Sequence, residues 1–142
     1  MDAKVKPVVR VAAAAIVKEG RVLATCRGTG RFKGFWELPG GKVEYEESPA
    51  ECAVRELREE LKVEIVLKGA GPSFKVEYEY PDFILQMEVF LARLKEDSPE
   101  PTLTEHQDMR YLGPGELESV TWLEADYRFL PQLKELLTRH GA

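Results

Sequence analysis

The chain has 142 residues, of which 44% are apolar and 32% are charged, and its formal net charge is −5. This length and balance match an ordinary globular domain rather than a disordered segment, so we expect a single domain over residues 1–142. The negative charge argues against broad binding to nucleic-acid polymers or anionic membranes, which usually requires a clustered Lys/Arg surface. An anionic ligand would therefore need local help from cations or from a metal ion.

Signals for export or membrane insertion are not visible in the sequence. Residues 1–10 have scattered charges instead of the apolar segment of a signal peptide. The apolar run at residues 11–17 is far shorter than the roughly 20 residues that span a bilayer.

Cys26 and Cys52 fall in different predicted elements without metal-binding spacing, so we expect neither a zinc site nor a disulfide. We expect a reduced cytoplasmic protein, either a monomer or a homodimer.

The N-terminal part of the chain predicts a β-hairpin followed by a basic loop. Apolar runs at residues 8–17 and 22–26 flank the turn signal Glu19-Gly20. Four alanines in the first run would let a helix pack closely on that strand. Residues 27–35 are rich in glycine and basic side chains and predict a loop before a short strand at 36–38. Such a loop alone indicates a solvated surface, but beside a carboxylate-metal site it equally fits contact with phosphate or base.

A turn and a helix follow in the middle of the chain. Pro39-Gly40-Gly41 predicts the turn. Ser48 then fits a helix N-cap, with Pro49 at the first helical position and Glu51 three residues after the cap. We expect this helix to extend to about residue 61.

The C-terminal half predicts further strands and helices. Residues 74–80 and 83–91 alternate apolar and polar side chains, which predicts a long antiparallel hairpin. A surface loop at 95–104, a short strand at 109–112, a short helix at 113–119 and an amphipathic helix at 125–139 follow. The sum is an α+β fold in α/β/α sandwich layers, with a mixed sheet flanked by helices.

Three carboxylates gather along one side of the central helix. Because each helical residue advances by about 100°, Glu56, Glu59 and Glu60 fall within an arc of about 100° beside the apolar face. Like charges at this spacing destabilise a helix by roughly 0.2 to 0.5 kcal/mol per pair. They therefore require either a nearby cation or exposure to water. In an isolated segment, a solvated helix face is the usual interpretation.

The spacing of these acids to the flanking elements favours a metal site instead. It resembles the Nudix box, Gx5Ex7REUxEExGU with U aliphatic, and only the last glycine differs, because Lys62 stands there. The matching positions are Gly41, Glu47, Arg55, Glu56, Leu57, Glu59, Glu60 and Val63. Similarity to the MutT-like nucleoside triphosphate pyrophosphohydrolases continues in the segments at 36–42, 76–82, 105–107 and 123–126. Lys62 replaces a residue suited to left-handed geometry at the end of a helix.

This resemblance implies a Nudix fold and a reaction. The expected reaction cleaves a (deoxy)nucleoside triphosphate to nucleoside monophosphate and pyrophosphate, with oxidised guanine or modified cytosine nucleotides as candidate substrates. The implied cofactor is Mg²⁺, with Mn²⁺ as an alternative, since hard oxygen ligands suit both ions. The implied ligands are the carboxylates of Glu56, Glu59, Glu60 and Glu105 and the backbone carbonyl of Gly40.

The resemblance also implies roles in catalysis and support. Glu56 is the first choice for the general base, oriented by Arg55, and Glu105 is the second. Gly41 and Glu47 are expected to be structural, with Glu47 pairing with Arg55 rather than contacting metal.

Base recognition would belong to Arg27, Leu38 and Asp126, which match the nucleotide pocket of the MutT-like group. Where the 8-oxoguanine-specific members carry Asn, this chain has Asp126. An ionised Asp only accepts hydrogen bonds, so it would accept from the cytosine amine or from N1 and N2 of guanine. Asp126 equally fits the N-cap of the last helix.

The sequence leaves two other functions open. The chain could hydrolyse another nucleoside diphosphate-linked compound, or it could be a non-catalytic nucleotide-binding sensor, which would be expected to lose the acids of the box. We expect Cys52 to be a small core filler. His106 is expected to be a surface residue or a loop anchor.

Overall fold

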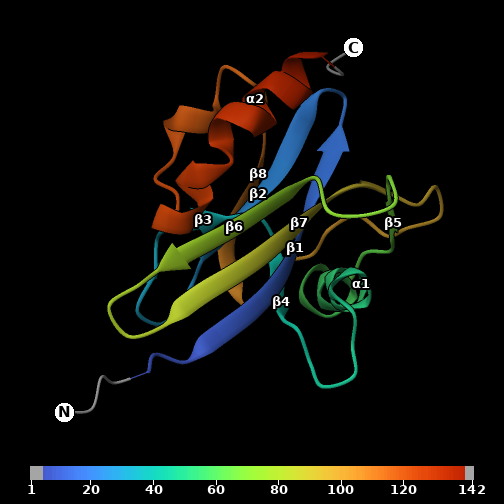
Figure 1. Ribbon diagram of the computed structural model, residues 1–142. Helices are drawn as coiled ribbons and strands as arrows, with labels where there is room; N and C mark the ends of the chain where they lie inside the picture. The colour runs from blue at the N-terminus through green and yellow to red at the C-terminus, as the bar shows by residue number, and fades with distance from the viewer. Residues whose placement is uncertain (1–4, 140–142) are drawn as a thin grey trace.

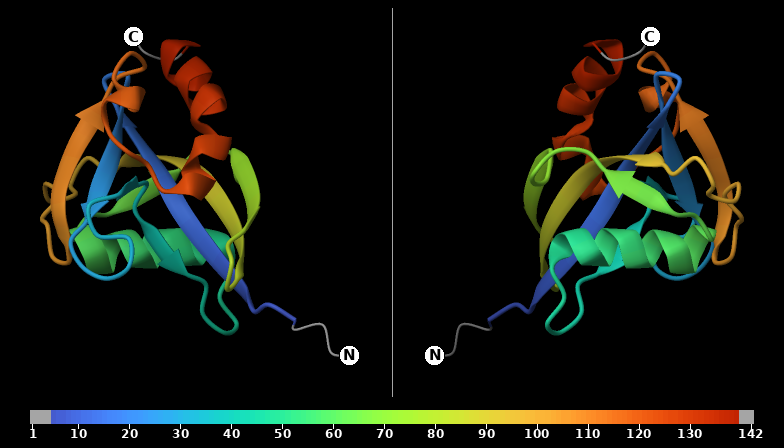
Figure 2. Two further views of the ribbon diagram at one scale, coloured as in Figure 1. Left: turned by 90° about the vertical axis from the view of Figure 1, so that its left-hand side faces the viewer. Right: turned by 90° about the vertical axis from the view of Figure 1, so that its right-hand side faces the viewer.

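The computed structural model describes residues 5–139, so the first residues of the segment used for the export expectation lie outside it. A mixed sheet has α1 on one side and α2 on the other (Figure 1, Figure 2). The elements are β1 Val8–Lys18, β2 Arg21–Arg27, β3 Trp36–Glu37, β4 Gly40–Lys42, α1 Pro49–Leu61, β5 Ile65–Leu67, β6 Phe74–Glu79, β7 Ile84–Leu94, β8 His106–Leu112, the 3-10 turns η1 Leu117–Ser119 and η2 Glu124–Arg128, and α2 Leu130–Arg139.

β1 is the central strand of this sheet. It pairs antiparallel with β2 and β4 and parallel with β7, so that Val11 lies opposite Met87. β7 also pairs antiparallel with β6 and β5, and β2 pairs antiparallel with β3 and β8. Both predicted hairpins, β1–β2 and β6–β7, are therefore confirmed.

The alanines of β1 separate two cores. Ala12 and Ala14 pack in the clusters that contain the buried residues of α1. Ala13 and Ala15 point the other way and pack in the cluster that contains the buried leucines of α2. Side chains alternate across a strand, so small residues at four successive positions let elements approach on both sides. The expected α+β arrangement in α/β/α layers is confirmed.

The helix α1 begins and ends where the sequence predicts. The Ser48 hydroxyl accepts from the Glu51 amide at 3.1 Å, and the Glu51 carboxylate accepts from the Ser48 amide at 2.9 Å, which completes a capping box. Lys62 ends the helix in the left-handed conformation, with φ 60° and ψ 34°. The geometry expected of a terminal glycine is thus adopted by a lysine.

The C-terminal predictions need corrections. The predicted continuous helix at 125–139 is wrong, because η2 is a separate 3-10 turn and α2 begins only at Leu130. Pro131 explains the position of this start, since proline is tolerated in the first turn of a helix and not in its interior. The predicted helix at 113–119 is the single turn η1, and the predicted strand at 109–112 extends back to His106. Short strands β4 and β5 were not predicted.

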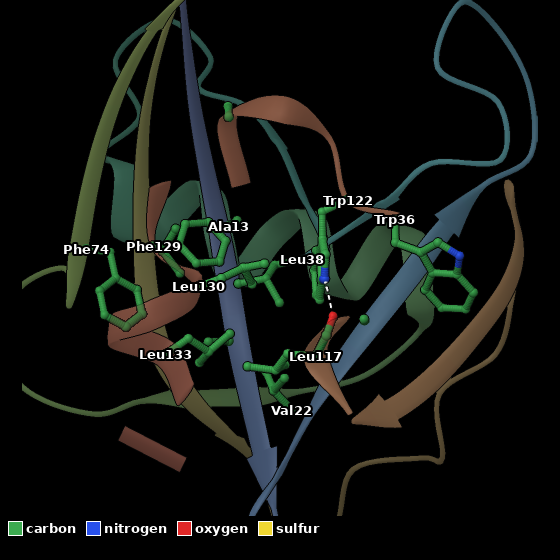
Figure 3. Packing of buried hydrophobic residues seen from close by; sticks show 14 of the residues in the cluster. Ala13, Val22, Trp36, Leu38, Phe74, Leu117, Trp122, Phe129, Leu130 and Leu133 are labelled. Atoms are coloured by element: carbon green, nitrogen blue, oxygen red, sulfur yellow. Dashed lines mark hydrogen bonds between the residues drawn. The ribbon is translucent and has the colours of Figure 1, made fainter. Parts of the chain in front are cut away.

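The core beside α2 is organised around Trp122, which is 0% exposed. Its indole N–H donates to the Leu117 carbonyl at 2.6 Å, as the dashed line in Figure 3 shows. Phe74 and Phe129 stack with ring centroids 5.6 Å apart and join β6 to the C-terminal segment. Within residues 5–139, no helix combines the length and the apolar character needed to cross a membrane.

We expect Lys62→Gly to stabilise the protein. Glycine adopts a positive φ without the steric penalty that a Cβ incurs, and the gain should be about 0.5 to 1 kcal/mol, partly offset by the greater entropy of the unfolded chain. Urea unfolding followed by circular dichroism measures the change. Lys68→Gly is the matched control, because Lys68 does not have a positive φ. Equal effects of the two substitutions would contradict this explanation.

Candidate active site

Two adjoining cavities lie beside β4, with volumes of about 390 Å³ and about 190 Å³. Both are lined by Arg27, Glu37 and Gly40. The larger cavity is mainly apolar, and the smaller one is acidic. We call them the apolar cavity and the acidic cavity.

The apolar cavity brings together the three residues predicted to bind the base, namely Arg27, Leu38 and Asp126. Its walls come from β1, β3, β4, β7, the loop after β2, the connection between β6 and β7 and the segment of η2. The remaining apolar lining residues are Pro7, Val9, Val11, Ala13, Phe32, Tyr80, Phe83, Leu85, Met87, Leu123 and Ala125. Ligand sites typically combine such apolar walls with a few polar groups that fix orientation.

Asp126 is 3% exposed and lies within η2, so it is not the N-cap of α2. Burial raises the pKa of its carboxyl well above the ordinary value, and the negative charge of Glu37 adds to this rise. The backbone amide of Leu38 and the guanidinium of Arg27 oppose it. The neutral form is therefore favoured relative to an exposed Asp, and a neutral carboxyl both donates and accepts. This modifies the expectation based on an ionised, purely accepting Asp126.

Arg27 and His106 meet at Glu37, between the two cavities. Arg27 donates from Nε at 3.0 Å and from Nη2 at 3.1 Å to the two carboxylate oxygens of Glu37. His106 Nε2 lies 3.3 Å from Glu37 Oε2, and its side chain is 7% exposed. The surface interpretation of His106 is wrong, and the anchoring one fits. Sequence reasoning missed Glu37, although it stands in the segment that resembles the MutT-like group.

Arg55 connects acids of α1 with acids of the segment that precedes this helix. Its guanidinium contacts Glu47 at 2.6 Å, Glu56 at 2.8 Å and Glu59 at 3.2 Å. Hydrogen bonds from Arg55 are the main cause that lowers the pKa of Glu47 to about 2. The expected ion pair between Glu47 and Arg55 is therefore present.

Gly41 allows Glu56 to lie directly against β4. A Cβ built at Gly41 would overlap the Glu56 carboxyl group. Cys52, on the same helix, is buried, and its thiol contacts the carbonyls of Gly41 and Lys42 at 3.4 Å. The expectation of a core filler at Cys52 is confirmed.

Glu60 faces the acidic cavity together with Gly40, Glu105 and His106. Its Oε1 atom is buried and has no hydrogen-bond partner among the described residues. Burial is the main cause that raises the pKa of Glu60 to about 8. His106 opposes the rise, while Glu56, Glu37 and Glu105 add to it. Negative charge thus accumulates around an oxygen that lacks a partner.

The donors of the acidic cavity fit a hard divalent cation, although the side chains do not form a ready coordination sphere. Within residues 5–139, no group of three or more His, Cys, Asp or Glu side chains is arranged to hold a metal ion. Glu59 is mostly exposed and contacts Arg55. The Glu60 oxygen that has no partner among the described residues and the carboxylate of Glu105 nevertheless match the preference of Mg²⁺ and Mn²⁺ for oxygen ligands, and His106 lines the same cavity.

The chain is similar to known proteins in both sequence and structure. A NUDIX domain model matches residues 6–133. The putative 8-oxo-dGTP diphosphatase 2 of Mycobacterium tuberculosis is 31% identical over 135 residues, covering 93% of this chain and 92% of that protein. The CTP pyrophosphohydrolase of Escherichia coli is 46% identical over 57 residues, which make up 39% of this chain and 42% of that protein. A MutT NUDIX hydrolase from Burkholderia pseudomallei has a similar structure, with a TM-score of 0.76 at 28% identity, covering 89% and 98% of the two chains.

The raised pKa of Glu60 predicts a pH-dependent stability in the absence of divalent cations. The folded carboxyl, with a pKa of about 8 instead of 4.5, binds its proton more tightly than the unfolded one does. The free energy of unfolding should therefore decrease as the pH rises from about 4.5 to about 8. Glu60→Gln should reduce this decrease.

Urea titrations in EDTA at several pH values measure this effect. Glu118→Gln, which changes an exposed carboxyl in η1, is the control and should leave the pH dependence of the wild type intact. Parallel curves for the wild type and Glu60→Gln would contradict the prediction.

Proposed function

This chain is a hydrolase of the NUDIX family, and on that premise we propose that it cleaves a (deoxy)nucleoside triphosphate to nucleoside monophosphate and pyrophosphate with Mg²⁺. The observation that carries the proposal is the direct contact between an apolar cavity of about 390 Å³ and an acidic one. A base fits the first environment, and a cation-bound phosphate chain fits the second. Relatives whose names specify 8-oxo-dGTP and CTP support a nucleotide with an oxidised guanine or a cytosine base.

Arg27 lies where the base and the phosphates would meet. Its guanidinium is held by both oxygens of Glu37, and its side chain remains 43% exposed. A fixed planar guanidinium with free N–H groups suits phosphate recognition. We propose that Arg27, which the sequence predicts to bind the base, also contacts the phosphate next to the sugar, and that Glu37 orients it.

We propose Glu56 as the carboxylate that accepts a proton from the attacking water. Arg55 binds one of its oxygens, and the backbone of Gly41 packs against the carboxyl group, so its orientation is fixed. Glu105, which lines the acidic cavity, is the second candidate for this role. When bound, Mg²⁺ would neutralise phosphate charge and lower the pKa of water. Gly40, Glu56, Glu59, Glu60 and Glu105 would hold it.

We expect the purified protein to release pyrophosphate from at least one member of a panel of canonical, oxidised and methylated nucleoside triphosphates with Mg²⁺. Glu56→Gln and Glu59→Gln should each lower kcat by at least about 100-fold, in line with the scale of acid–base and metal catalysis. Product chromatography distinguishes pyrophosphate from orthophosphate.

Glu51→Gln is the matched control for these variants. It changes a carboxylate of the same helix, and glutamine retains the acceptor of the capping box. No turnover of any triphosphate by the folded protein would refute the proposal, and unchanged rates in both site variants would remove these residues from it.

Asp126→Asn should change the base preference. A neutral carboxyl can carry its proton on either oxygen, whereas an amide has one fixed donor and one fixed acceptor. We expect the ratio of kcat/KM for 8-oxo-dGTP to that for dCTP to rise by about tenfold, the scale of a hydrogen-bonded base discrimination. Steady-state kinetics with both nucleotides measures the ratio, and an unchanged ratio would exclude Asp126 from base recognition.

A further inference from the structure

Tyr80 lines the apolar cavity and has no role in the proposed reaction. It follows β6 directly, and its backbone N–H donates to the Phe83 carbonyl at 2.8 Å. Its side chain is 6% exposed and stacks on Phe83, with ring centroids 4.8 Å apart at 18°. Phe32, from the loop after β2, packs against it at 5.9 Å. The ring is therefore held between two segments of the cavity wall.

The hydroxyl of Tyr80 reaches η2. It accepts a hydrogen bond from the backbone N–H of Ala125 at 3.2 Å in the buried interior. This bond satisfies one of the amides that the start of a helical turn leaves unpaired, and among the described residues no side chain caps η2 at Leu123. A phenol that accepts a hydrogen bond still carries its own proton. Within residues 5–139, the Ala125 bond is the one hydrogen bond of this hydroxyl, so its proton is available to a ligand.

The residue after Ala125 is Asp126, and both Tyr80 and Asp126 line the apolar cavity. Burial is the main cause that raises the pKa of Tyr80, and the Asp126 charge adds to it, while the Ala125 amide opposes it. The phenol is therefore protonated at neutral pH and can act as a donor. Two polar groups thus border a cavity whose other walls are mostly apolar.

We infer that the Tyr80 hydroxyl reads the nucleobase beside Asp126, by donating a hydrogen bond to an acceptor on the edge of the base. The inference rests on the proposed function, because it places a nucleotide base in the apolar cavity. The ligand class is a base that presents an acceptor next to a group bound by Asp126. Guanine offers O6 beside its N1–H, and cytosine offers N3 beside its amine.

Tyr80→Phe tests this role, because it keeps the stacked ring and removes the hydroxyl. We expect kcat/KM for the preferred nucleotide to fall by about 3- to 10-fold, the scale of one hydrogen bond between neutral groups, mainly through KM. Deoxyribose 5′-triphosphate, which has no base, should be cleaved at the wild-type efficiency. A purely structural role of the hydroxyl would lower both values equally.

Tyr78→Phe is the matched control. Tyr78 lies two residues earlier on β6, its hydroxyl donates to Glu124, and it is not among the residues that line the apolar cavity. Its substitution should leave kcat/KM unchanged for both substrates. Three results would each overturn the inference. Tyr80→Phe could lose kcat/KM equally on the two substrates, or its kcat/KM for the preferred nucleotide could equal that of the wild type. The third such result is a Tyr80→Phe protein that does not fold.

Calorimetric binding of CMP, GMP and 8-oxo-GMP separates this inference from the proposed hydrolysis. If the wild type cleaves no triphosphate but binds one of these monophosphates several-fold more tightly than Tyr80→Phe does, the hydrolysis is refuted and the base reading stands. Equal affinities of the two proteins, or no binding to the wild type, would overturn the base reading.

Discussion

The close approach of α1 to β4 at Gly40 and Gly41 is the constraint on which the site depends. A Cβ at Gly40 would overlap the backbone of β1, and a Cβ at Gly41 would overlap the carboxyl of Glu56. Two successive residues without side chains thus bring the central strand, β4 and the acidic helix into contact. Gly40 of β4 lines both cavities, so the position of the acids relative to the apolar cavity is fixed by backbone packing.

Charge is distributed unevenly across this arrangement. Arg55 contacts four carboxylates and Arg27 contacts one, and both arginines are themselves held in place by these contacts. Glu60 has a raised pKa and a buried oxygen that lacks a hydrogen-bond partner in the part of the chain that the structure describes. Such a group destabilises the folded protein when ionised, and a bound cation would remove the cost. The same charge distribution therefore lowers the stability of the protein without a cation and raises the affinity of the site for one.

The apolar cavity is assembled differently from the acidic one. Among its polar residues, Arg27, Asp126 and Tyr80 come from three separate segments, and aromatic stacking and the bond between Tyr80 and Ala125 hold the wall together. The acids of α1 belong to one helix, and their relative positions follow from its geometry. Local variation in the loops can therefore alter base recognition without moving the acids of the helix.

Patterns that depend on neighbours in the sequence were predictable. The capping box, the hairpins β1–β2 and β6–β7 and the side of α1 that carries Glu56 and Glu60 follow from turn residues, alternation and helical periodicity, because each is a local property of the chain. Local patterns did not reveal that Pro131 divides the C-terminal segment into η2 and α2. The burial of a side chain and its hydrogen-bond partners depend on elements that are distant in the sequence. The sequence by itself therefore determined which acids share one helix edge. Only the tertiary structure decided that Glu37 joins Arg27 to His106, that Glu60 and Asp126 are buried, and that Tyr80 meets η2, because long-range packing sets the solvent exposure and hydrogen-bond partners of each group.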